Sequence, residues 1–205
     1  MNEYIVKLDG PYLISNYFEE VLSSRRSVRE YSREPIKLDI LGRLLWAGQG
    51  ITDSVKGLRT APSAGALYPL ELYIVANNVE GLVPGIYKYL PTSHEVVLIS
   101  VGSVGLELYN ASLEQSMVKD AAAVIVVCAV YNKMYIKYGS RSGRYLYFEA
   151  GCAAENISLQ AVSLGLGTVV IGAFDDEKVK KLLVLPETEF PLCLTLVGKG
   201  KEEAI

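Results

Sequence analysis

Apolar residues gather in short runs along this chain, and turn residues separate the runs. The run at 121–130 (AAAVIVVCAV) contains no polar residue, which is typical of a central strand covered on both faces. Further runs of strand length predict strands at 70–77, 85–90, 95–100, 168–174 and 192–197. A short Pro/Thr/Ser turn joins the second and third of these, so they predict a hairpin.

Other segments place apolar residues at the three- and four-residue spacing of a helix. They predict helices at 15–24, 38–48, 103–113 and 145–166, and a short helix that starts at 175–177. Ser103 is the expected N-cap of the third helix, and Gly165 and Gly167 are expected to end the fourth. Strands with intervening helices indicate an α+β fold or mixed α/β layers.

The helix at 145–166 carries apolar residues on nearly every side. This predicts burial, either in a large core or in a subunit interface. The small residues Gly151, Ala153 and Ala154 would let another helix approach closely.

Two segments lack a clear period. Residues 51–66 are rich in small and turn residues, and they predict a long loop of the kind that is usually functional or disordered. Residues 131–144 are polar and rich in tyrosine, and they predict an irregular connection.

Composition bounds the class of protein. The chain has 205 residues, of which 50% are hydrophobic, and a formal net charge of -3. This predicts a single domain over 1–205, with an N-terminal extension at 1–14, or one protomer of an intertwined dimer. The acidic balance argues against broad nucleic-acid binding. Without a membrane-spanning run or a signal sequence, the expected location is the cytoplasm.

The cysteines and the histidine point away from several chemistries. Cys128, Cys152 and Cys193 lie far apart in apolar runs, so buried structural thiols are expected rather than a disulfide framework or a metal site. His94 is the single histidine, and it lies in a predicted turn with no supporting triad or zinc motif. No metal ligands are predicted.

A cluster of cations follows the first predicted helix, in the sequence RRSVREY at 25–31. Guanidinium groups present planar forks of donors that fit phosphate oxygens, and a hydroxyl can add a further bond. The cluster is therefore either a phosphate site or the solvated basic end of a helix.

Two glycine-containing segments could accept a flat ligand. Residues 62–66 offer backbone amides and a hydroxyl without bulky side chains, so they form either a ligand platform or an ordered surface loop. Gly172 interrupts a predicted buried strand, which often marks close approach of a ligand to the backbone. The sequence at 165–167 (GLG) is not a dinucleotide fingerprint, because it follows a helix and opens a strand.

Taken together, these motifs resemble the nitroreductase superfamily of flavin enzymes, and more closely its SagB-type, azoline-dehydrogenase-like branch. The resemblance runs from about residue 25 to residue 199. The segments that carry it are RRSVREY at 25–31, APSAGALYP at 61–69, Gln115, KYGSRSGRYLYFEAG at 137–151, GLGTVVIG at 165–172 and LVGKG at 196–200.

The resemblance implies an α+β, nitroreductase-like fold with a mixed, mainly antiparallel central sheet flanked by helices. It also implies an intertwined homodimer with FMN at the subunit interface. The residues implied to hold the phosphate and ribityl chain are Arg25, Arg26 and Ser27, with Lys199 as a second cation. Those implied to come from the partner subunit are Pro62, Ser63, Ala64 and Gly65. Those implied to line the flavin ring are Gln115, Val170, Ile171 and Gly172, with Arg29 at the pyrimidine edge or the phosphate.

The family pattern is not matched everywhere. Classical nitroreductases carry asparagine and glutamine where this chain has Ala66 and Tyr68, and an often acidic position is Ile171 here. The azoline dehydrogenases use a Lys-Tyr pair, and Lys137 and Tyr138 match it by position. This pair is either catalytic or part of a solvated loop.

The resemblance implies an FMN-dependent oxidoreductase that passes hydride from NAD(P)H to a small organic acceptor of the nitroarene or quinone type by ping-pong chemistry. One alternative is a SagB-type thiazoline/oxazoline dehydrogenase that acts on a modified peptide. Another alternative is a flavin-storage or flavin-sensing protein without turnover.

Overall fold

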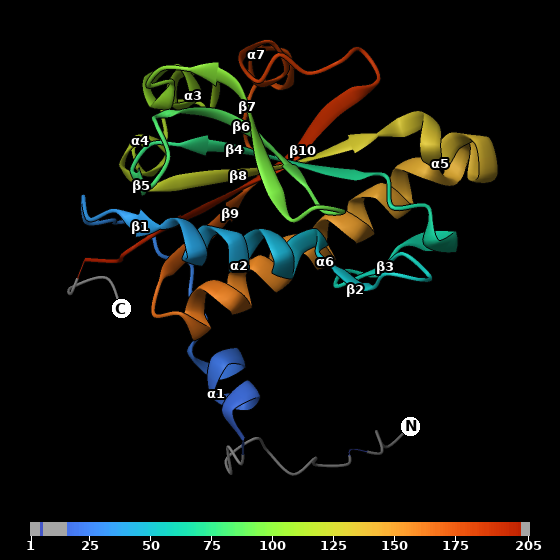
Figure 1. Cartoon of the computed structure of the whole chain (residues 1–205), viewed down its shortest axis with the longest axis horizontal. Helices are drawn as coiled ribbons and strands as arrows, with labels where there is room; N and C mark the ends of the chain where they lie inside the picture. The colour runs from blue at the N-terminus through green and yellow to red at the C-terminus, as the bar shows by residue number, and fades with distance from the viewer. Residues whose placement is uncertain (1–4, 6–15, 202–205) are drawn as a thin grey trace.

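A six-stranded sheet forms the centre of the molecule (Figure 1). The structure is a computed structural model that describes residues 5 and 16–201; the predicted extension at 1–14 otherwise lies outside the described residues. Neighbouring strands of the sheet are all antiparallel, in the order β7-β6-β4-β8-β10-β9. The strands are β4 (Leu70–Ala76), β6 (Gly85–Leu90), β7 (Glu95–Val101), β8 (Ala123–Val130), β9 (Gly167–Ile171) and β10 (Glu189–Gly198).

The central position predicted for the apolar run at 121–130 is confirmed, because β8 lies between β4 and β10 and is buried over nearly its whole length. The predicted hairpin is confirmed as β6 and β7. Two short pairs lie outside the main sheet. They are the parallel pair β1 (Ile36–Lys37) with β5 (Val79–Glu80), and the antiparallel pair β2 (Ile51–Asp53) with β3 (Leu58–Arg59).

Helices cover both faces of the sheet (Figure 1). One face packs against α2 and α6, and the other packs against α3 and α7. The helices are α1 (Tyr17–Ser24), α2 (Leu38–Gln49), α3 (Gly105–Ala111), α4 (Met117–Asp120), α5 (Tyr131–Tyr138), α6 (Ser142–Ser163) and α7 (Asp176–Leu182). The predicted α+β fold is therefore confirmed, and among the named strands of residues 16–201 only β1 and β5 pair in parallel.

The long helix α6 uses its alanine-rich side to reach the core. Ala153, Ile157 and Ala161 are fully buried in the cluster that joins α2, α6 and the sheet. On another side, Tyr147 and Phe148 are 65% and 64% exposed. The apolar residues of α6 thus fall into two sets. One set is buried in the core of the chain, and the other lies on its surface.

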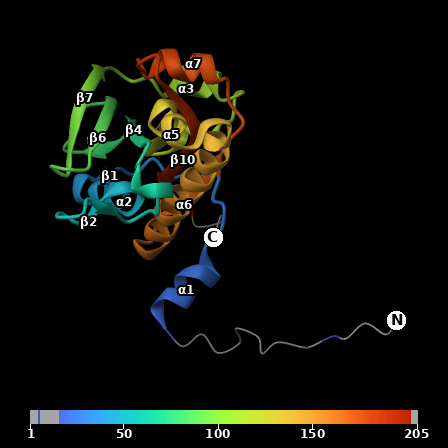
Figure 2. The same cartoon turned by 90° about the vertical axis from the view of Figure 1, so that its right-hand side faces the viewer.

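Helix α1 projects away from the body of the molecule (Figures 1 and 2). The Asn16 side chain caps its first turn by accepting a hydrogen bond from the Glu19 backbone N–H at 3.0 Å. Tyr17 and Phe18 are more than 60% exposed, although the Tyr17 hydroxyl donates to the Ser163 carbonyl oxygen at 2.9 Å. This helix therefore shows a largely apolar surface to its surroundings.

The segment at 131–144, predicted as a polar, tyrosine-rich connection, is mostly helical. This segment forms α5, a 3₁₀ turn at Gly139–Arg141 and the first turn of α6. Met134 is fully buried, and the rings of Tyr131 and Tyr135 stack at 5.5 Å, one helical turn apart. These contacts support a helix that the polar composition did not indicate.

Other local predictions also change. Helix α3 begins at Gly105, and Ser103 is not its cap; the N-cap is Val104, without a side-chain hydrogen bond. The predicted loop at 51–66 contains β2, β3 and a 3₁₀ turn at Ala64–Ala66. Asp53 closes the β2–β3 turn by accepting from the backbone N–H groups of Val55 and Lys56.

The cysteine prediction is confirmed for two of the three thiols. Cys128 and Cys193 are buried, whereas Cys152 is only partly buried on α6. His94 is an exposed turn residue, as predicted, and its Nδ1 lies 2.8 Å from the Tyr89 hydroxyl. Within the described part of the chain, no helix is both long and apolar enough to cross a membrane.

Candidate functional site

The segment Arg25–Arg29, here called the arginine arm, docks on strand β9 at the edge of the sheet. Ser27 forms a parallel bridge with Thr168, and the Val28 N–H donates to the Thr168 carbonyl oxygen at 2.9 Å. A Cβ at Gly167 would lie 2.9 Å from the Val28 Cβ, so glycine is needed for the arm to come this close. The arm is thus held by backbone contacts that leave its charged side chains available.

The guanidinium groups of the arm reach the surface. Arg26 and Arg29 are exposed, and both donate only to nearby backbone carbonyl oxygens in the hydrogen bonds of the described residues. Arg25 is partly buried and lies 3.6 Å from Glu155 on α6. Three cations thus lie on one short, anchored segment, and guanidinium groups are donors of the kind that fit phosphate oxygens.

Lys199 lies beside the arm because the end of the chain pairs with the residues that follow it. The Ser32 N–H donates to the Lys199 carbonyl oxygen at 2.8 Å, and Tyr31 bridges Gly200. The Lys199 ammonium contacts the Glu34 carboxylate at 2.7 Å. The structure thus brings the two predicted cation segments together, with Lys199 engaged by an acid.

Strand β9 and its exit provide an open wall next to the arm. Val170 is 42% exposed, and a Cβ at Gly172 would meet no atom within 4 Å. Ile171 instead points inward and is only 8% exposed. Of the three residues predicted at the flavin in and just after β9, Val170 and Gly172 are exposed, whereas the Ile171 side chain is buried.

Gln115 lies at the same end of β9. Its amide nitrogen donates to the carbonyl oxygens of Ser112 and Ala173, both at 2.9 Å. Gln115 is therefore close to the predicted wall, but its amide nitrogen secures the chain after β9.

The segment Pro62–Gly65, here called the platform loop, meets the Lys137–Tyr138 pair. The backbone of Gly65 has a φ of 63°, and a Cβ there would lie 2.7 Å from the Tyr138 hydroxyl and nearer still to the Lys137 amine. The Tyr138 ring also packs on Tyr145 with centroids 4.6 Å apart. The platform loop and the Lys137–Tyr138 pair thus form one group in space, although Gly65 and Lys137 are 72 positions apart in the sequence.

A buried acid of α6 holds the platform loop. The Glu149 carboxylate, 5% exposed, accepts from the Ala64 backbone N–H at 2.8 Å and also bonds the Ser63 hydroxyl. Burial raises the pKa of Glu149, and the hydrogen bonds from Ala64 and Ser63 offset only part of this rise. Beside this acid lies a small hollow of about 280 Å³, lined by Pro62, Ser63, Ala64, Tyr145, Phe148, Glu149 and Cys152.

The arm and the platform loop border different halves of α6. The arm reaches Glu155, whereas the loop reaches Glu149, six residues or about 9 Å earlier along the helix. One chain therefore gathers the predicted residues into two groups rather than one site.

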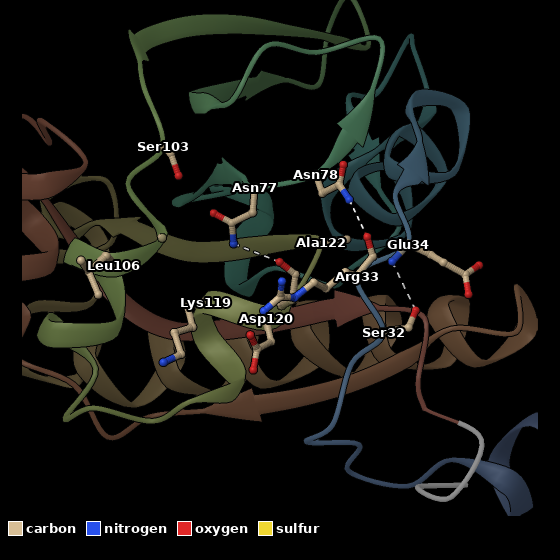
Figure 3. A pocket seen from close by; sticks show the side chains of 12 residues that line it. Ser32, Arg33, Glu34, Asn77, Asn78, Ser103, Leu106, Lys119, Asp120 and Ala122 are labelled. Atoms are coloured by element: carbon tan, nitrogen blue, oxygen red, sulfur yellow. Dashed lines mark hydrogen bonds between the residues drawn. The ribbon is translucent and has the colours of Figure 1, made fainter.

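A separate polar cleft of about 560 Å³ lies beyond the arm, between residues 32–34 and the start of α3 (Figure 3). Asn77 and Asn78 line it, and their amide nitrogens donate to the carbonyl oxygens of Ala121 and Arg33 at 3.0 and 2.8 Å. None of the predicted flavin-site residues lines this cleft.

The sequence also matches a family model, the nitroreductase family, over residues 22–199. The chain belongs to the nitroreductase family. The match includes the arginine arm, the platform loop, the Lys137–Tyr138 pair and Lys199.

Relatives within the nitroreductase family differ in length. MJ1384 of Methanocaldococcus jannaschii, which is named as a nitroreductase, is 44% identical to this chain. The match covers 90% of this chain and 91% of MJ1384. The microcin B17-processing protein McbC of Escherichia coli is 30% identical over 71% of this chain, but only 56% of McbC is covered. A crystal structure of a Ralstonia eutropha protein with a nitroreductase name superposes with a TM-score of 0.80, at 28% identity over 95% of this chain and 89% of that one.

Two residues of the family-like segment at 137–151, Tyr145 and Glu149, were given no role in the sequence analysis. Glu149 holds the platform loop, and Tyr145 packs on Tyr138. Glu149 left a signal in the sequence, because it is a carboxylate among the buried positions of a largely apolar helix. A buried acid without a nearby cation in sequence usually has a specific hydrogen-bond partner.

Proposed function

We propose that this protein is an FMN-dependent oxidoreductase that works as a homodimer and takes hydride from NAD(P)H for a small organic acceptor. The observation that carries the proposal is the arginine arm docked on the open edge strand β9. An anchored cluster of cations next to a wall without obstructing side chains suits a flat ring that carries a phosphate.

The arm would hold the phosphate end of the cofactor. Arg25, Arg26 and Ser27 present charged and hydroxyl donors on one segment, and backbone bonds to Thr168 fix that segment. Lys199 would add a cation whose position Glu34 already sets. Charge-assisted hydrogen bonds of this kind are among the strongest in proteins.

The wall made by Val170 and Gly172 would lie along the flavin ring, since no side chain projects from Gly172 into the space in front of it. Arg29 is exposed beside this wall and would place a positive charge at the pyrimidine edge, where negative charge develops on reduction. When bound, FMN would supply hydride exchange at its N5 atom, and donor and acceptor would use the site in turn.

A homodimer would complete the site. Tyr147 and Phe148 on α6, and Tyr17 and Phe18 on α1, are exposed apolar side chains of the kind that a second copy of the chain could cover. The platform loop borders the other half of α6. A second copy packed along α6 would bring its platform loop toward the first copy's arm, which supports a shared site at the interface.

The proposal is tested by the visible absorption spectrum of the purified protein and by its mass in solution. We expect a yellow homodimer with about one FMN per subunit, whose flavin band bleaches under anaerobic NAD(P)H. A colourless protein that FMN cannot reconstitute would overturn the proposal. A flavin-loaded protein that no reductant bleaches would favour flavin storage instead.

A second candidate function, a peptide thiazoline or oxazoline dehydrogenase, is favoured by the contact of Lys137 and Tyr138 with the platform loop. Such a reaction needs a base to remove a carbon-bound proton as hydride leaves the substrate. The similarity to McbC, a microcin-processing protein, supports this candidate. This chain spans about half of McbC, so any partner protein that presents a peptide is part of the proposal.

A further inference from the structure

Glu149 is a buried carboxylate with no cation beside it. It is 5% exposed on the core side of α6, and among the ion pairs of residues 16–201 it has no partner. Burying an unpaired charge is unfavourable unless hydrogen bonds satisfy it. An alanine or a leucine would be more favourable in this buried part of a helix. The acid is therefore expected to stabilise a group to which it is hydrogen-bonded.

What it contacts is the platform loop, 85 residues earlier in the chain. Glu149 Oε1 accepts from the Ala64 N–H at 2.8 Å, and the carboxylate also bonds the Ser63 hydroxyl. The Ser63 oxygen in turn accepts from the Tyr68 N–H at 2.9 Å. A single carboxylate thus begins a chain of hydrogen bonds that spans residues 63–68.

The loop needs such a hold because the backbone at its end and in the residues directly after it is strained. Gly65, Ala66 and Tyr68 all have positive φ values, of 63°, 53° and 46°. Left-handed conformations cost energy at residues other than glycine and persist only where the surroundings impose them. The 3₁₀ turn supplies one internal bond, from the Ala66 N–H to the Ser63 carbonyl oxygen at 3.0 Å; Glu149 supplies the bonds from outside.

The position of the loop sets the space left for the Lys137 amine and the Tyr138 hydroxyl. Both groups lie against Gly65, within the space that a Cβ would occupy. Tyr145, one turn before Glu149 on α6, packs on the Tyr138 ring. Helix α6 therefore reaches this pair twice, directly through Tyr145 and indirectly through Glu149 and the loop.

We infer that Glu149 is a positioning residue: it fixes the platform loop and, through Gly65, sets where the Lys137 amine and the Tyr138 hydroxyl stand. The inference rests on the proposed function only where it concerns a catalytic role of Lys137 and Tyr138. The loop anchor itself is a property of the protein without cofactor.

The first test is amide hydrogen exchange of the protein without flavin, for Glu149→Ala, Glu149→Gln and the control Ser158→Ala. Ser158 is a buried polar side chain on the same helix, and within the described part of the chain its hydroxyl donates to the Ala154 carbonyl oxygen alone. We expect exchange at Ala64 and Tyr68 to accelerate by about tenfold or more in Glu149→Ala, with 70–76 still protected. Glu149→Gln should partly restore protection, because its oxygen can still accept from Ala64. Ser158→Ala should leave the loop unchanged.

The second test follows the Lys137 amine by its rate of acetylation as a function of pH, with Lys178 as an internal reference on α7. In Glu149→Ala we expect the pH profile of Lys137 to shift while that of Lys178 stays fixed. Gly65→Ala should shift the same profile without touching Glu149, because its Cβ would displace the amine. A merely structural role of Glu149 would leave the Lys137 profile unmoved.

The outcomes are distinct. Unchanged loop exchange in both Glu149 variants, or a loose loop with an unmoved Lys137 profile, would overturn the inference. If Glu149→Ala does not fold, Glu149→Gln and Gly65→Ala decide by the same two measurements. A protein that shows the expected exchange and acetylation but binds no FMN would overturn the proposed function and leave the anchor in place.

Discussion

At the scale of single residues, the molecule carries exposed charges on the arginine arm and a buried charge within α6. Arg26 and Arg29 are exposed on an anchored segment, whereas Glu149 is buried and satisfied by backbone and hydroxyl donors. Removing an exposed arginine of the arm should have little effect on folding. Replacing the buried Glu149 should change how the free energy of unfolding depends on pH.

Arg25→Ala should weaken FMN binding and leave the fold intact, because it deletes a charge-assisted contact worth roughly 1.5–3 kcal/mol. That corresponds to an increase of about 10- to 150-fold in the dissociation constant of FMN, measured by fluorescence titration. The matched control is Lys181→Ala on α7, an exposed cation far from β9. Equal affinity in the two variants would make the arginine arm a solvated helix end.

Glu149→Gln should change the pH dependence of stability in a defined direction. Because burial raises the pKa of Glu149 in the folded protein, the folded state binds this proton more tightly than the unfolded state. Its contribution is therefore most favourable below the unfolded pKa of about 4.3 and is lost as pH rises toward the folded pKa. Urea unfolding at several pH values should show the Gln variant gaining stability relative to wild type as pH rises. A constant difference would contradict this.

At the scale of elements, the apolar runs predicted the strands well because burial on both faces leaves a continuous signal, as in β8. Helix α5 was missed because it is stabilised by the buried Met134 and by stacked tyrosines, which a polar sequence does not reveal. The site was predicted as separate motifs along the chain. That the platform loop meets Lys137, and that Glu149 holds the loop, depends on contacts between residues 70 or more positions apart.

Helix α6 is the element on which a homodimer would depend. Ala154 is 3% exposed and lies in the core of its own chain, so a charge there would disrupt the fold. Phe148→Glu instead places a charge on the exposed side, where burial against a second copy would cost about 2 kcal/mol or more per subunit.

We expect Phe148→Glu to be a monomer that retains little FMN, as measured by light scattering after gel filtration and by flavin absorbance. The control is Val101→Glu on the edge strand β7, since Val101 is exposed to a similar extent, 68% against 64%. A flavin-loaded dimer from Phe148→Glu would place the interface elsewhere.

At the scale of the whole molecule, the fold separates the two groups of predicted site residues. The arginine arm and β9 lie by the second half of α6, and the platform loop with Lys137 and Tyr138 lies by the first half. A reductase that receives hydride from NAD(P)H needs the first group for its cofactor but no base from the second. A peptide dehydrogenase needs both.

The double variant Lys137→Ala/Tyr138→Phe distinguishes these activities. We expect NAD(P)H-dependent quinone or nitroarene reduction to survive within about tenfold, a change of less than roughly 1.4 kcal/mol in the barrier. The measurement is steady-state turnover with FMN occupancy confirmed by absorbance. A loss of several orders of magnitude at full occupancy would move the peptide dehydrogenase to first place.

The pairing of the arginine arm with β9 and with the end of the chain has a consequence for biosynthesis. Ser27 meets Thr168 and Tyr31 meets Gly200, so residues made early must wait for residues made about 140 and 170 positions later. At about 5–20 residues per second, translation imposes a delay of roughly ten to thirty seconds. During that time the arginines have no strand to dock on. In the proposed function, capture of FMN by the arginine arm would therefore follow the synthesis of β9 and of the segment around Gly200.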